Sequence, residues 1–170
     1  MDLTRDLDRR ITYGVVGGTF AGLLFLLANM WYADSQGLPA VAPLYDISTI
    51  FYFTDKPDPQ PINAAVGLVV HLTLAAAFGA ALAALAPLAK GTARLAGMGA
   101  AFGLLLYLVN FQILGRIVFE WFQEGPNQTF EVFAHLGYGL LVVPFLVRFA
   151  STDADEHTAS RAGATRPGAT

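Results

Sequence analysis

The sequence contains no cysteine, and this removes a whole group of functional sites. Without thiols the chain forms no disulfides, ligates neither zinc nor an iron–sulfur cluster through sulfur, and has no cysteine nucleophile. Charged residues are scarce too, at 14% of 170 residues against roughly 25% in soluble domains. The ten lysines and arginines are not clustered, so the sequence predicts no nucleic-acid partner.

Recognisable catalytic motifs are also missing. The sequence has no HExxH, no glycine-rich phosphate loop, no carboxylate cluster and no nucleophile and base at a known spacing. Arg116 and Glu120 are one helical turn apart, and we expect them to pair at the membrane surface rather than to catalyse. The sequence therefore favours a protein without enzymatic activity and predicts no catalytic residue.

Long apolar segments dominate what is present. Hydrophobic residues make up 55% of the chain, and the mean hydropathy is +0.51. A helix needs about 20 apolar residues to cross a bilayer, and four segments reach that length. The sequence thus predicts an all-α, antiparallel up-down bundle of four membrane helices in residues 1–150, with spans at about 11–32, 62–88, 95–118 and 129–149.

The distribution of basic residues predicts the orientation of these spans, because short cytoplasmic loops are enriched in lysine and arginine. Three such residues precede the first span, two lie between the second and third, and one ends the fourth (Arg5, Arg9, Arg10; Lys90, Arg94; Arg148). We expect both termini in the cytoplasm. Residues 151–170 are small and polar, which predicts a disordered cytoplasmic tail.

The first outer connection, residues 33–61, contains an apolar and aromatic stretch at 43–53 (PLYDISTIFYF). This stretch is too short to cross a bilayer. It reads either as an amphipathic helix at the lipid headgroups or as a re-entrant cap over the bundle, and the surface helix is the commoner arrangement.

Small residues repeat at helical spacing in every predicted span. Such stripes let membrane helices approach closely, so we expect them at helix contacts within the chain, or equally in a homo-oligomer or a larger membrane complex. The glycines concerned are Gly14, Gly18, Gly22, Gly67, Gly79, Gly99, Gly103 and Gly139.

Polar residues lie on the same faces as these stripes. At about 1.5 Å per residue, those of all four spans fall in the outer half of the membrane. Polar groups at that depth are costly, so they suggest an interior site. The sequence predicts a shared layer of Asn29, His71, Asn110, Glu131, His135 and Tyr138.

Three interpretations of this layer stay open. Its side chains can simply join the helices by hydrogen bonds. His71 and His135 can ligate haem iron, or a transition metal with Glu131 as third ligand. The layer can also serve a small transporter or proton-relay subunit. We expect a non-catalytic accessory or binding protein of the lipid bilayer, without a cofactor, and keep the haem or metal binder and the transporter as alternatives.

Overall fold

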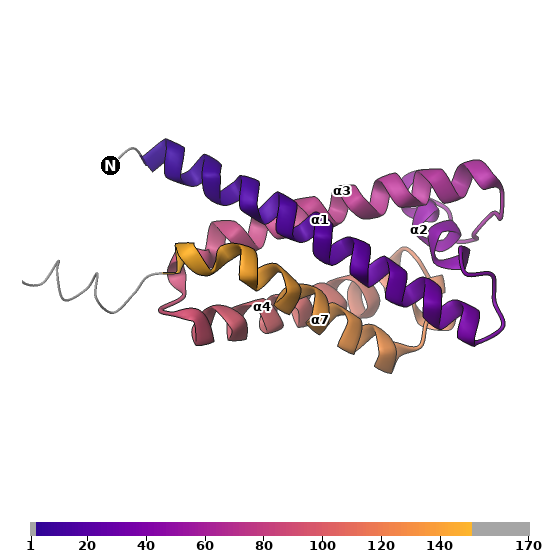
Figure 1. Cartoon of the computed structure of the whole chain (residues 1–170). Helices are drawn as coiled ribbons and strands as arrows, with labels where there is room; N and C mark the ends of the chain where they lie inside the picture. The colour runs from indigo at the N-terminus through magenta and orange to yellow at the C-terminus, as the bar shows by residue number, and fades with distance from the viewer. Residues whose placement is uncertain (1–2, 151–170) are drawn as a thin grey trace, which may run out of the picture.

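The structure, a computed structural model, describes residues 3–150, with side chains from Asp6 onward. The tail predicted at residues 151–170 lies outside the described residues. The predicted fold class is confirmed, since the described part of the chain consists of helices and connections without a strand. Four long helices alternate in direction, as an up-down bundle requires (Figure 1).

Each long helix has the length and composition to cross a membrane. The apolar stretches comprise residues 6–35, 61–88, 92–117 and 128–149, which indicates a multi-pass membrane protein. The helices are α1 (Leu3–Ser35), α3 (Pro61–Leu85) continued by η1 (Ala86–Leu88), α4 (Thr92–Tyr107), and α7 (Gln128–Leu146) continued by η3 (Val147–Phe149). The first helix begins well before the predicted span, because its polar first turns are helical too.

Helix α1 crosses α3 at a contact built from glycine and alanine (Figure 1). Gly14 lies against Gly79 and Ala83, and Gly18 lies against Gly79 and Ala75. A side chain at Gly79 would overlap the Gly14 carbonyl oxygen and approach the Gly18 Cα to 2.6 Å. Absence of a Cβ therefore sets how closely the two backbones pack, as in other small-residue membrane contacts.

Helix α7 packs between α1 and α4, and glycines again mark the closest points. Gly99 and Gly139 face each other, while Gly103 lies against the backbone of His135. The remaining predicted glycines are also at contacts: Gly22 against Ala75, and Gly67 against Leu44. By contrast, Gly97 and Gly137 face open space, so these two glycines are not needed for packing.

The apolar stretch in the first connection forms helix α2 (Ala42–Tyr52), which packs against α3. Gly67 of α3 accommodates the carbonyl of Leu44. On the other side, Trp121 of α6 (Trp121–Glu124) donates from Nε1 to Thr49 Oγ1 at 2.7 Å. Helix α2 therefore joins α3 to the connection that leads into α7, at the end of the bundle opposite the N-terminus (Figure 1).

The third long helix is irregular where the sequence predicts a continuous α-helix. After Tyr107 the chain forms a π-helix, η2 (Leu108–Leu114), followed by α5 (Gly115–Ile117). The side-chain Nε2 of Gln123 donates to the carbonyl of Phe111 within this segment. A π-helix widens the turn, so residues five apart come onto one face, and such segments are frequent at functional sites.

The α1–α3 crossing gives a direct prediction. We expect Gly79→Ala to lower the free energy of unfolding by about 1–3 kcal/mol, because its methyl group overpacks against Gly14 and Gly18. The matched control is Gly137→Ala, which adds the same methyl group in open space and should be neutral or mildly stabilising. Denaturant unfolding in detergent measures both. Equal stability of the two variants would contradict the crossing.

Candidate functional site

The ring of Phe25 on α1 lies at the centre of the candidate site. The imidazole of His71 on α3 stacks on it, with centroids 5.7 Å apart and an interplanar angle of 26°. His135 on α7 meets the same ring edge-on, at 4.9 Å and 86°. One phenyl ring thus contacts two imidazoles and links three of the long helices.

His71 is fixed by a hydrogen bond to the backbone of α1. Its Nε2 lies 2.8 Å from the carbonyl oxygen of Gly22. A carbonyl oxygen only accepts, so Nε2 carries the proton and donates it. Gly22 has no side chain, so Ala75 of α3 can lie directly against the α1 backbone at this level. This close approach lets His71 reach the carbonyl of Gly22.

His135 is the more enclosed of the two histidines, with 6% of its surface exposed. Its Nδ1 lies 2.8 Å from the carbonyl oxygen of Glu131, one turn earlier on α7, and 3.5 Å from Oε2 of the same residue. The rings of Tyr107 and Phe111 meet the imidazole edge-on, at 5.9 Å and 5.5 Å. His135 and Glu131 therefore form an interior pair walled by aromatic rings.

Glu131 brings a carboxyl group into this interior, with 4% of the residue exposed. Within residues 6–150, only Arg10 has a fully enclosed side-chain nitrogen or oxygen without a hydrogen-bond partner. Glu131 also belongs to the first turn of α7, where the partial positive charge of a helix N-terminus favours an acidic side chain.

Tyr138 lies at the end of the polar layer that meets the apolar core. Its hydroxyl donates to the carbonyl of Ala75 at 2.6 Å and so joins α7 directly to α3. Beyond it the bundle is filled by apolar side chains that are 0% exposed: Leu82, Leu95, Val142 and Leu146. The polar layer therefore ends at Tyr138 and does not continue through this core.

Two of the six predicted residues stay apart from the cluster. Asn29 donates to the carbonyl of Phe25 on its own helix, at 3.2 Å. Asn110 is half-buried in η2, and its side chain makes no hydrogen bond to any other described residue. The structure therefore brings His71 and His135 together on Phe25, with Glu131 beside His135 and Tyr138 bonded to α3 one turn from His71.

A second polar network lies next to this cluster. The Tyr107 hydroxyl donates to Gln128 Oε1 at 3.0 Å and accepts from Gln112 Nε2 at 2.9 Å. Arg116 extends the chain by donating to Gln112 Oε1 at 3.0 Å. Gln112 follows Tyr107 by five residues, a spacing that an α-helix places on different sides. The π-helix brings them together, and no sequence signal marks that change.

The residues present do not fit a haem or metal held between the two histidines. Each imidazole uses one nitrogen on a backbone carbonyl, which by itself suits a metal ligand. However, the Phe25 ring packs against both imidazoles and occupies space beside each of them. Within the described residues, no three His, Asp or Glu side chains form a metal-binding group.

Asp46 on α2 is an ionisable group that the sequence does not single out. It lies outside the four candidate spans, and burial raises its pKa from 3.8 to about 6. Desolvation disfavours the charged carboxylate, and burial alone accounts for the shift. Helix α2 therefore packs more favourably when Asp46 is protonated.

A double-mutant cycle tests contact within the cluster. We expect His71→Ala and His135→Ala each to lower stability, and their effects to be coupled by about 0.5 kcal/mol or more because both rings contact Phe25. The coupling should fall when Phe25 is replaced by leucine. Thr73→Ala is the control, since Thr73 is exposed and bonds only its own helix. Additive losses would contradict a shared cluster.

The raised pKa of Asp46 predicts a pH-dependent stability. The unfolded carboxyl loses its proton near pH 3.8 and the folded one near pH 6, so stability falls between these values and stays lower above them. Asp46→Asn should therefore stabilise the protein at pH 7.5 by about 1–2 kcal/mol, allowing for remaining solvent screening. Near pH 4 the gain should largely disappear. A gain that is independent of pH would contradict burial of the charge.

Comparison of the chain with protein-family models, with curated proteins and with solved structures finds no match.

Proposed function

We propose that this chain is a non-catalytic accessory or binding protein of a membrane. In this proposal the polar layer of His71, Glu131, His135 and Tyr138 fixes the outer half of the bundle. The hydrogen bonds of His71 and Tyr138 carry this proposal. Each side chain bonds the backbone carbonyl of a neighbouring helix, at Gly22 and Ala75. Such bonds hold the relative positions of membrane helices, and Phe25 packs against the imidazoles of His71 and His135.

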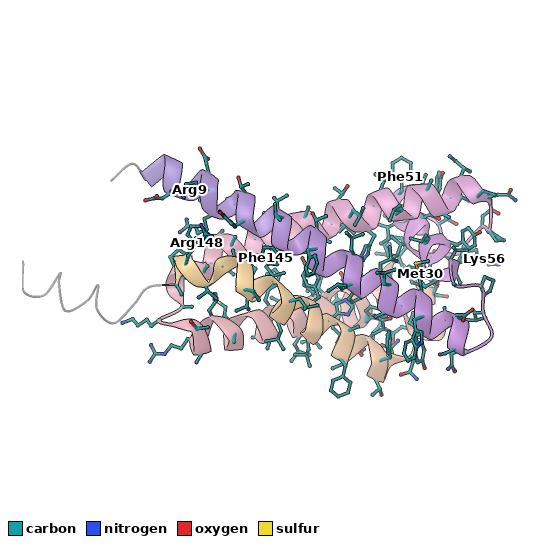
Figure 2. The ribbon with its side chains drawn as sticks, in the orientation of Figure 1. Arg9, Met30, Phe51, Lys56, Phe145 and Arg148 are labelled. Carbon is teal, nitrogen blue, oxygen red and sulfur yellow. The ribbon has the colours of Figure 1, made fainter. Side chains whose placement is uncertain are left out.

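The proposed orientation has both termini in the cytoplasm. Support comes from the basic residues near the N-terminal end of α1, the end of α7 and the connection between α3 and α4. In Figure 2, Arg9 and Arg148 lie at one end of the bundle, and Lys56 lies at the other. The histidine layer then belongs to the half of the membrane away from the cytoplasm.

A proton-relay subunit is the second candidate, and one observation favours it. Glu131 and His135 are an interior acid and base 3.5 Å apart, a pair that suits proton transfer. The apolar core of Leu82, Val142 and Leu146 weighs against a path through a single chain, because it separates this pair from the other end. The hypothesis of a haem or metal binder has less support, since the Phe25 ring packs against both imidazoles.

Thiol labelling tests the orientation without a background, because the chain has no native cysteine. We expect a membrane-impermeant maleimide to label Asp55→Cys, in the loop after α2, in intact cells. Asp8→Cys, near the start of α1, should react only after the membrane is permeabilised. The reverse pattern would place the termini outside.

Reconstitution separates the accessory role from the relay. Proteoliposomes should show no more proton flux than protein-free vesicles, and His135→Ala should leave that flux unchanged. Native mass spectrometry after mild solubilisation should find the chain in a stoichiometric complex with another membrane protein. Proton flux that depends on His135 would contradict the accessory role and support the relay. A chain found only alone or with its own copies would also contradict it.

A further inference from the structure

The two ends of the bundle carry opposite charge. Among residues 6–150, the end that holds the start of α1 has five basic side chains (Arg9, Arg10, Lys90, Arg94, Arg148) and two acidic ones (Asp6, Asp8). The opposite end has two basic side chains (Lys56, Arg116) and six acidic ones (Asp34, Asp46, Asp55, Asp58, Glu120, Glu124). An anionic partner is therefore favoured at the first end.

Arg10 differs from the other basic residues at this end. It precedes Gly14 and Gly17 by one and two helical turns, and these glycines face α3 and α7. Arg10 thus lies on the inward side of α1 and is half-buried, whereas Arg9 is exposed. Its Nε is fully enclosed and has no hydrogen-bond partner among the described residues. An enclosed donor without a partner costs stability, and an anionic group held by the same guanidinium would offset part of that cost.

Arg148 reaches the same place from the other end of the chain. Its guanidinium carbon lies 4.1 Å from the centre of the Tyr13 ring, a cation–π contact that positions the charge. Tyr13 is one turn after Arg10 on α1. Arg148 therefore reaches α1 within one turn of Arg10. No carboxylate of the described residues pairs with either arginine.

We propose that Arg10 and Arg148 bind the phosphate of an anionic phospholipid at this surface of the membrane. Guanidinium groups match phosphate oxygens in geometry and charge. A lipid is favoured over a free phosphate because the surface next to the site is apolar and runs along a candidate span. Val16 and Phe20 of α1 are 52% and 47% exposed, and Phe20 contacts Phe145 of α7. The headgroup then meets the arginines while an acyl chain lies on these side chains.

Native mass spectrometry of the full chain with phosphatidylglycerol or phosphatidylcholine tests the proposal. We expect selective retention of phosphatidylglycerol, about tenfold weaker in Arg10→Gln and in Arg148→Gln because each loses a charge-assisted hydrogen bond. Arg9→Gln is the matched control, since it removes the same charge from an exposed neighbour. It should bind like the native chain.

Thermal unfolding with the same lipids keeps the test valid if a glutamine variant folds poorly. Phosphatidylglycerol should raise the melting temperature of the native chain. Arg10→Lys keeps the charge but loses the planar set of guanidinium donors, so it should reduce that rise. Three results would overturn the proposal: equal retention of the two lipids, an equal loss in Arg9→Gln, or full stabilisation by inorganic phosphate alone. The last result would indicate a free-anion site.

Discussion

The close approach of α1 and α3 at Gly14, Gly18 and Gly79 is the contact on which the other features depend. Between apolar helices in a bilayer, association gains little from the hydrophobic effect, and close packing of backbones has to replace it. The same approach continues at Gly22 and Ala75, and there the side chain of His71 reaches the α1 backbone. The close packing of small residues therefore also places the polar layer.

The bundle divides into two halves with different fillings. In the half that contains α2, aromatic rings and imidazoles occupy the interior, and their polar atoms bond mainly to backbone carbonyls. In the other half, the buried side chains are mainly leucine, valine and alanine. Helix α2 and the π-helix η2 both belong to the half that holds the imidazoles, so the departures from a regular bundle gather around the candidate site. This concentration of irregular structure is typical of a functional region.

The sequence predicts the parts of this arrangement that follow helical spacing. Glycines four apart mark the faces that meet, and His71 and His135 lie on those faces, so the inward placement of both histidines follows from the spacing. The rings that contact them do not follow from it. Asn29 lies on the same kind of face, yet it bonds its own helix, because an asparagine can satisfy itself on the preceding turn.

Other parts depend on contacts that spacing does not encode. The π-helix changes which residues of the third span share a face, so Gln112 joins Tyr107 and Asn110 does not join the cluster. The docking of α2 includes a bond from Trp121 to Thr49 across a separation of 72 residues. Such long-range side-chain bonds follow from the folded bundle and leave no periodic signal in the sequence.

The protonation of the two histidines tests the central claim most directly, namely that backbone carbonyls fix the polar layer. Nitrogen-15 solid-state NMR of histidine-labelled protein in lipid at neutral pH, in a His157→Gln background, observes only His71 and His135. The structure predicts that His71 carries a proton on Nε2 and His135 on Nδ1, because each of these nitrogens donates to a backbone carbonyl. Reversed tautomers would contradict both carbonyl bonds and the fixed layer that they define.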